Sequence, residues 1–178
     1  MLVVLVAAEA GMAAGPWREL HRPLELPRLT AGETCPVSSV GGGVDWESAN
    51  IFGGRGIGRG PVYAGLGGPP VGTFPVQVYP ERPGWLAGKL FWYVEPEYRG
   101  RVLIRGRRID GQGPLQFEVR RATELRVGIG ETVRWHGQPR GSRGVPSGVL
   151  VKTPGCYAVQ VDGTDFSRRI VFRATSSS

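Results

Sequence analysis

The residues that could do chemistry in this chain are few and lie far apart in the sequence. The two cysteines are Cys35 and Cys156, and the two histidines are His21 and His136. A zinc site is not expected from this spacing, and neither is a copper site, which needs two histidines together with a cysteine. No G-x-S-x-G turn marks a nucleophile. We therefore predict no catalytic residues, no bound metal and no cofactor.

Two pairs of carboxylates are close enough in sequence for acid–base chemistry or for calcium binding. Glu95 and Glu97 flank a proline, and Asp162 and Asp165 lie around the last short loop. Carboxylates beside proline or glycine are typical of turns. A calcium ion takes about six to eight oxygen ligands, which is more than this loop offers. We interpret both pairs as turn residues.

The glycine-rich segment 41–75 is the first place to look for a phosphate-binding loop, because glycines let backbone N–H groups approach an anion. Its glycines at positions 54, 56, 58 and 60 do not follow G-x-G-x-x-G, and no G-K-[ST] comes after them. We expect a long surface loop with short strands at 62–63 and 76–79. Long ordered loops often carry function, so a binding site is predicted here, at Trp46, Arg55, Arg59 and Tyr63.

The two cysteines and residues 1–15 indicate the cellular compartment in which the protein is expected. Cys35 and Cys156 allow a single intrachain pairing, and we favour a disulfide over two free thiols if the protein is exported. Residues 1–15, MLVVLVAAEAGMAAG, are apolar with small residues near their end but have no basic start. We interpret them as a truncated signal peptide, with a short buried strand or helix as the alternative. The expected location is secreted or cell envelope.

The formal net charge of +7 comes from arginine, since all basic residues except Lys89 and Lys152 are arginines. A basic chain can attract an anionic partner. The arginines run from Arg18 to Arg173 and mostly occupy outward positions of predicted strands, which favours a solvated surface over a binding patch. No specific nucleic-acid signal is present. An anionic polymer and another envelope protein remain as candidate partners.

The elements that must hold these residues are strands, and the clearest lie at 148–173. Within this stretch, bulky apolar side chains occupy every second position and alternate with smaller or polar ones. This period of two predicts a half-buried strand. The inward set is Tyr157, Val159 and Val161, and the outward set is Cys156, Ala158, Gln160 and Asp162. A second run follows a short loop, so two antiparallel strands are predicted.

Other alternating segments extend the β pattern through the chain. We predict a central strand at 85–95 with Trp92 in the core, half-buried strands at 101–108, 115–119 and 125–129, and a polar loop at 137–146. Prolines at 16, 23 and 27 favour an extended arm over 16–40, with at most an edge strand at 24–29. No segment has a helical period. The pattern predicts one all-β sandwich domain over 41–178.

The run PGCYAVQVDG at 154–163 resembles the P-G-x-Y-x-V-x-V-x-G strand near the end of many bacterial immunoglobulin-like domains. The resemblance implies an immunoglobulin-like β-sandwich of about seven or more short antiparallel strands. It also implies a structural role for Tyr157, whose counterpart bonds to nearby backbone. The tail 167–174, with the strand before it, is similar to uncharacterised secreted or lipoprotein-type proteins of GC-rich bacteria.

The cysteine position departs from the antibody-type pattern. Those domains carry an inward cysteine two residues after the tyrosine, where this chain has Val159. Cys156 faces the opposite side, so a bond from Cys35 would fasten the arm to the outside of the sheet.

The expected function is that of a non-enzymatic, secreted or envelope module that binds a partner or has a structural role. One alternative is a subunit of an extracellular assembly, in which the leucines of the arm complete the sheet of a second copy or another subunit. The other is a small hydrolase acting on a surface polymer, with its residues gathered in the glycine-rich loops.

Overall fold

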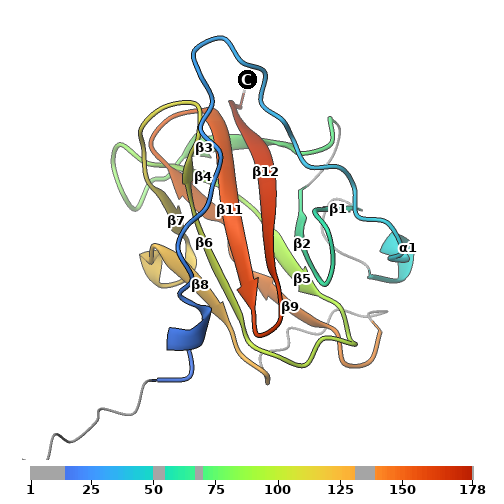
Figure 1. Cartoon of the computed structure of the whole chain (residues 1–178). Coiled ribbons are helices and arrows are strands. Elements are labelled where there is room, and N and C mark those ends of the chain that lie inside the picture. Colours follow the sequence, from blue (N-terminus) through green and yellow to red (C-terminus); the bar gives the residue numbers. More distant parts are fainter. Residues whose placement is uncertain (1–14, 50–54, 67–69, 131–138, 178) are drawn as a thin grey trace, which may run out of the picture.

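Two β-sheets make up the body of the protein, and the amino-terminal segment runs along their outer surfaces (Figure 1). The computed structural model describes residues 15–49, 55–66, 70–130 and 139–177. Most of the segment interpreted as a signal peptide, and His136, lie outside these residues. Among the described residues, no helix is long and apolar enough to cross a membrane.

The described strands follow one another with little helix between them. They are β1 (Gly56–Ile57), β2 (Val62–Gly65), β3 (Thr73–Val78), β4 (Leu86–Gly88), β5 (Phe91–Val94), β6 (Val102–Arg108), β7 (Leu115–Phe117), β8 (Glu124–Val127), β9 (Arg143–Pro146), β10 (Val149–Val151), β11 (Gly155–Gly163) and β12 (Ser167–Ser176). Short helical turns are η1 (Arg18–Leu20), α1 (Trp46–Ala49) and η2 (Val119–Arg121). The predicted all-β fold is confirmed.

The smaller sheet has the order β1-β2-β5-β9, and the larger has the order β7-β10-β4-β3-β12-β11-β6-β8. Neighbouring strands are antiparallel except for β12 and β3, which run parallel. Isolated bridges join Arg107 to Pro114 and Phe117 to Ala122, and they bring β7 against β6 and the start of β8. The larger sheet is therefore strongly curled.

The main core lies between the two sheets and explains why their strands alternate. The inward residues of β11, from Tyr157 to Val161, meet Trp92 and Val94 of β5 in one buried cluster. Trp92 is fully buried, packs edge-on against Phe117 with ring centroids 5.9 Å apart, and donates a hydrogen bond from Nε1 to the carbonyl of Ser147. An indole needs such a partner when it leaves water.

The carboxy-terminal hairpin is confirmed. β11 pairs with β12 from Gly155 to Asp162, and the hydroxyl of Tyr157 donates a 2.7 Å hydrogen bond to the carbonyl of Thr153. The predicted stretch 148–173 also contains residues 149–151, which are not part of the hairpin and form the separate strand β10, between β7 and β4. The sharp bend at residues 152–154 separates them, and β10 pairs elsewhere.

The single central strand predicted at 85–95 is instead two strands in different sheets. β4 belongs to the larger sheet and β5 to the smaller one. Leu90, Trp92 and Val94 face the main core, whereas Phe91 and Tyr93 face outward under α1. Apolar residues on both faces are typical of a strand that is buried on both sides. The chain stays largely buried where it leaves β4 in the larger sheet and enters β5 in the smaller one.

Three further predictions need correction. β7 ends at Phe117, because residues 118–121 form a turn in which Arg121 N–H bonds to the carbonyl of Glu118. Ile129 lies beyond β8 and is exposed. Arg143 belongs to strand β9, not to a polar loop, and is buried; its guanidinium donates to three carbonyls, those of Gly128, Tyr98 and Gly100.

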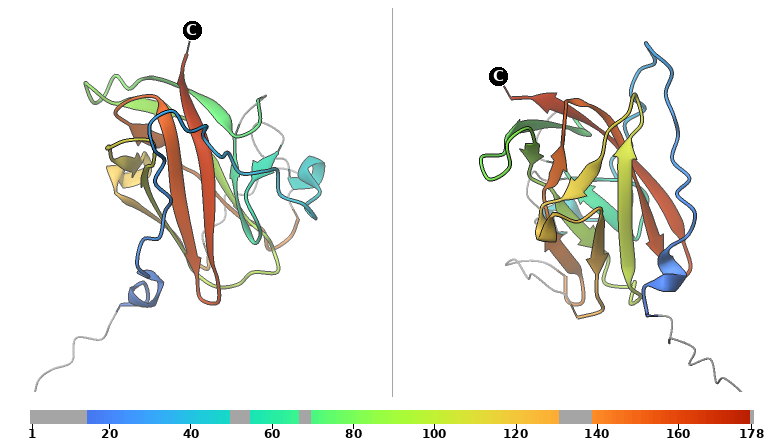
Figure 2. Two further views of the ribbon diagram at one scale, coloured as in Figure 1. Left: turned by 45° about the horizontal axis from the view of Figure 1, so that its top comes forward. Right: turned by 90° about the vertical axis from the view of Figure 1, so that its left-hand side faces the viewer.

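The arm crosses the outer face of β11 and β12, as both views of Figure 2 show. No strand forms at 24–29, because prolines at 23 and 27 lack N–H groups and the arm lies on a face, not at an edge. Side chains hold it instead: Gln160 donates from Nε2 to the carbonyl of Pro23 and accepts from Glu25 N–H. The same face carries a small apolar cluster of Leu26, Cys35, Ile109, Cys156, Ala158 and Val171.

Candidate binding site at Trp46

The outer face of the smaller sheet carries an aromatic cluster capped by Trp46. Tyr63 from β2 and Phe91 and Tyr93 from β5 form its floor. The ring of Trp46 meets Tyr63 edge-on, with centroids 4.9 Å apart, and Tyr93 with centroids 6.1 Å apart. Its Nε1 donates a 3.0 Å hydrogen bond to the carbonyl of Gly41. The indole is half-buried and held from two directions.

Glycines of the segment 41–75 make room for this ring. A Cβ added at Gly56 would lie 2.7 Å from the Trp46 ring, and one added at Gly41 would clash with Tyr63. The same two glycines are joined, Gly41 N–H donating to the carbonyl of Gly56. Close approach between backbone and an aromatic ring is a reason for glycine, so these positions serve packing of Trp46.

Tyr63 supports the site from below. It is 2 % exposed, and its hydroxyl donates a 2.8 Å hydrogen bond to Glu95 Oε1. Burial, and then the hydrogen bond and charge of Glu95, raise the pKa of Tyr63 well above its ordinary value. Burial and the charges of Glu95 and Glu97 raise the pKa of Tyr93 as well. Both tyrosines therefore stay neutral across the physiological range, and Glu95 accepts a hydrogen bond from Tyr63.

A hollow of about 610 Å³ opens beside Trp46, with walls that are mainly polar. Its walls are Val40, Gly41, Val44, Asp45, Trp46, Glu47 and Arg55. The Asp45 side chain accepts from Glu47 N–H at 3.1 Å, which shapes the turn that starts α1. Trp46 and Arg55, two of the four residues predicted from the sequence, thus lie together. Arg59 is exposed but does not line this hollow.

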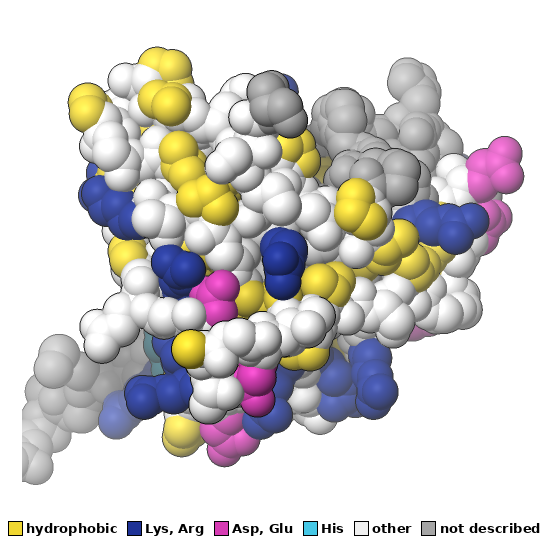
Figure 3. Space-filling view, turned by 90° about the horizontal axis from the view of Figure 1, so that it is seen from above, with side chains coloured by type: hydrophobic (Ala, Val, Ile, Leu, Met, Phe, Trp, Pro, Cys, Tyr) yellow, Lys and Arg dark blue, Asp and Glu magenta, His cyan; other side chains and the backbone are white. Residues whose placement is uncertain are grey.

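Several arginines hold the arm against the sheet through hydrogen bonds, a role that sequence reasoning missed. Arg105 donates to the carbonyl of Arg22 at 2.6 Å, Arg107 donates to that of Leu26 at 3.1 Å, and Arg22 donates to that of Thr164 at 3.1 Å. These bonds tie the arm to β6 and to the hairpin loop. In the view from above in Figure 3, Lys and Arg side chains lie at several places on the visible face, with Asp and Glu side chains among them.

The buried carboxylate of Asp162 interacts with two of these arginines, Arg105 and Arg22. Asp162 is fully buried, and it accepts from Arg105 at 2.7 Å, from Ser167 at 2.8 Å and from Gln160 at 3.1 Å. Arg22 lies 3.7 Å away. The interpretation of Asp162 as a plain turn residue therefore needs correction, because it is the centre of a polar network under the arm. The signal in the sequence was its outward position beside Gln160 in an otherwise apolar strand.

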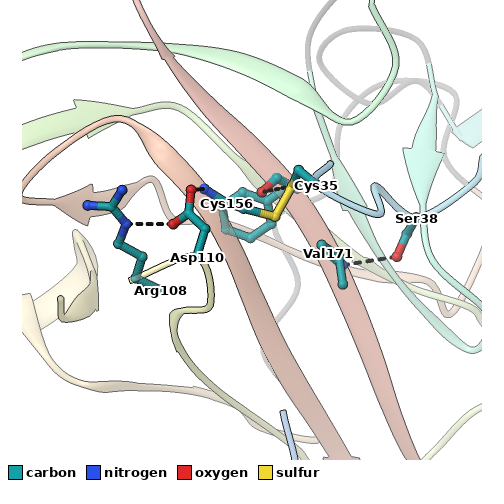
Figure 4. Close-up of a disulfide and its surroundings, with 7 residues drawn as sticks. Cys35, Ser38, Arg108, Asp110, Cys156 and Val171 are labelled. Atoms are coloured by element: carbon teal, nitrogen blue, oxygen red, sulfur yellow. Dashed lines mark hydrogen bonds and ion pairs between the residues drawn. A yellow bond between two sulfur atoms is a disulfide. The ribbon is translucent and has the colours of Figure 1, made fainter. Parts of the chain in front are cut away.

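The predicted disulfide between Cys35 and Cys156 is confirmed, with Cα atoms 5.6 Å apart (Figure 4). It lies on the outer face of the sheet, as the position of Cys156 indicated. Beside it, Asp110 accepts hydrogen bonds from Cys156 N–H at 2.9 Å and from Arg108 Nε at 2.6 Å. Ser38 Oγ accepts from Val171 N–H on the other side. The arm is therefore fixed covalently and by hydrogen bonds at this point.

His21 has a structural partner. Its Nε2 lies 2.8 Å from Glu124 Oε2 at the foot of the arm. Within the described ranges, no group of three or more His, Cys, Asp or Glu side chains comes together in a way that would hold a metal ion.

Comparisons with protein-family models, with curated proteins and with solved structures find no match for this chain. Functional inferences therefore rest on its own residues.

Proposed function

We propose that this protein is a non-enzymatic module that binds carbohydrate at the hollow beside Trp46. The observation that carries the proposal is a half-buried indole, fixed on an aromatic floor, with Asp45, Glu47 and Arg55 around the same hollow. A flat apolar ring packs against the C–H face of a sugar, and carboxylates and guanidinium groups hydrogen-bond its hydroxyls. A few convergent polar groups orient a ligand in a concave site, and Asp45, Glu47 and Arg55 are such groups here.

The same proposal places the protein outside the cytoplasm, as a secreted or cell-envelope module. Disulfides persist in oxidising compartments, so the bond between Cys35 and Cys156 supports this location. The hydrogen bond from Tyr157 to the Thr153 carbonyl supports the resemblance to bacterial immunoglobulin-like domains. Such a module would bind surface or matrix sugars.

The assembly alternative has less support. The arm lies across its own β11–β12 face and is tied there by a disulfide. Donating it to a second copy would cost the hydrogen bonds from Gln160, Arg105 and Arg107. The binding proposal needs no such rearrangement.

The test is a binding survey with uncharged and acidic oligosaccharides, measured by calorimetry and by affinity electrophoresis. Trp46→Ala should weaken binding at least tenfold, and Arg55→Ala should weaken it by a smaller factor. Arg59→Ala is the matched control, because it removes the same charge from an exposed position outside the hollow. Absence of binding to every sugar, or equal affinity for Trp46→Ala and the unchanged protein, would refute the proposal. Turnover of any polymer would favour the hydrolase alternative.

A further inference from the structure

A second hollow, far from Trp46 in the sequence, lies where the arm meets the loop between β6 and β7. Its volume is about 500 Å³. Three arginines line it: Arg28 from the arm, and Arg107 and Arg108 from the end of β6. The loop supplies Gly111, Gln112 and Gly113, and the two glycines add no side chain to the space. A Cβ at Gly111 would lie 3.3 Å from Arg108 Nε.

Two of these guanidinium groups are held rigidly while keeping donors free. Arg107 donates from Nη1 to the carbonyl of Arg108 and from Nη2 to that of Leu26. Arg108 donates from Nε to Asp110 and from Nη1 to Thr153 Oγ1. A guanidinium has five N–H donors, so each keeps three that bond to nothing among the described residues. Arg28 is exposed at the rim.

The nearest carboxylate does not neutralise the hollow. Asp110 accepts from Arg108 through one oxygen and from Cys156 N–H through the other. Burial alone would raise the pKa of Asp110, but these hydrogen bonds and the positive charge of Arg108 outweigh it and lower the pKa. Three guanidinium charges against one carboxylate leave a surplus of positive charge in the hollow.

We propose that this hollow binds the sulfate or phosphate ester group of an acidic polysaccharide. Arginine matches the oxygens of such tetrahedral anions through paired hydrogen bonds. The hollow is larger than one anion and leaves room for the sugar that carries it. The disulfide beside it indicates an oxidising compartment, where acidic polysaccharides are the abundant polyanions.

The site depends on the arm being in place. Leu29 N–H donates to the carbonyl of Ile109 at 2.7 Å, and Ile109 N–H donates to the carbonyl of Cys156 at 2.9 Å. Arg28 is therefore positioned through a short chain of bonds that ends at the disulfide-bearing strand. Breaking the disulfide would loosen Arg28 and leave Arg107 and Arg108 on β6.

The experiment measures binding of four soluble polymers to the full chain over a salt series: a sulfated dextran, a phosphorylated dextran, a carboxylated dextran of matched charge density, and plain dextran. Single-stranded DNA of similar charge density is the fifth arm. The sulfated or the phosphorylated polymer should bind at least tenfold more tightly than the carboxylated one, and the pair shows which ester is preferred. Equal binding of the carboxylated polymer or of DNA would overturn the proposal in favour of unspecific charge attraction.

Variants locate the site. Arg28→Ala should weaken binding of the preferred polymer about tenfold. Arg28→Lys should weaken it by a smaller factor, because lysine keeps the positive charge but cannot bond in a planar, paired way. Arg59→Ala removes the same charge elsewhere and should change binding less than twofold. Equal losses in Arg28→Ala and Arg59→Ala would overturn the proposal. In Trp46→Ala, the preference for the ester-bearing polymer over the carboxylated one should equal that of the unchanged protein, so this outcome is distinguishable from loss of the proposed sugar site.

Discussion

The guanidinium of Arg105 lies 2.7 Å from the carboxylate of Asp162, which is completely buried beneath the arm. The pair joins β6 to β11, and Arg105 also holds the backbone of the arm at Arg22. Removing one partner of a buried ion pair is costly, because the other charge stays in a poorly solvated place. The pair is therefore the first place to test how the arm is kept on the sheet.

Arg105→Ala should lower the free energy of unfolding by about 3 kcal/mol, measured by urea denaturation. Arg169→Ala is the matched control, since it breaks the ion pair with Glu25 in which both side chains are more than half exposed. Exposed pairs contribute about 0 to 1 kcal/mol. Equal losses in the two variants would mean that the buried network does not hold the arm.

Replacing both cysteines should destabilise the chain strongly. The bond spans a sequence separation of 121 residues, for which the chain-entropy model gives about 4 to 5 kcal/mol. Cys35→Ala with Cys156→Ala should show this loss in denaturant, and reduction of the unchanged protein should mimic it. Mass spectrometry of non-reduced peptides gives the independent check, and two free thiols in secreted material would contradict the assignment.

Gly56→Ala should displace Trp46, because the added Cβ would lie 2.7 Å from the indole. We expect a shift in tryptophan fluorescence, weaker sugar binding, and a stability loss of about 1 to 3 kcal/mol from overpacking. Gly42→Ala is the control in the same segment, since a Cβ there meets nothing within 4 Å. Unchanged fluorescence in Gly56→Ala would show that Trp46 does not rest on that backbone.

Acid should weaken the contact between Asp110 and Arg108. The pKa of Asp110 is lower in the folded chain than in the unfolded one, so the unfolded chain takes up the proton first as the pH falls. The stabilisation is complete above the unfolded pKa of about 3.9 and disappears as the pH drops through the lower folded value.

The measurement is the unfolding free energy between about pH 6 and pH 2, for the unchanged chain and for Asp110→Asn. The variant should lose stability near neutral pH and show a flatter acid limb. Parallel curves for the two proteins would indicate that Asp110 titrates alike in both states.

Strand positions were predictable wherever the two faces of a strand differ in composition, even where the arm later buries the second face, as it does on β11. Tyr157, Val159 and Val161 alternate with Cys156 and Ala158, and this period places the disulfide on the outer face of β11 as well. Segment 85–95 gave no such guide, because its residues are apolar on both faces. The break between β4 and β5 arises because each strand pairs in a different sheet. That pairing is set by tertiary contacts, which the local sequence pattern does not show.

The site could be predicted only in part for a related reason. Trp46 and Arg55, which line one hollow, were predicted as site residues because an aromatic and a basic residue in a glycine-rich segment suit a binding site. The fastening roles of Arg105 and Arg107 were hidden, because their acceptors are carbonyls of the arm about eighty residues earlier. An arginine in a sequence does not reveal which carbonyls it will reach.

The position of Cys35 along the chain has a mechanical consequence. Tension applied at residue 15 would pull first on the arm, whose polar fasteners lie before Cys35. The disulfide would then carry the load into β11, which is paired on both sides by β6 and β12. Residues 36–49, including the turn at Trp46, follow the disulfide in the chain and would carry none of this load. A molecule tethered through its amino end would therefore keep the hollow beside Trp46 intact under strain.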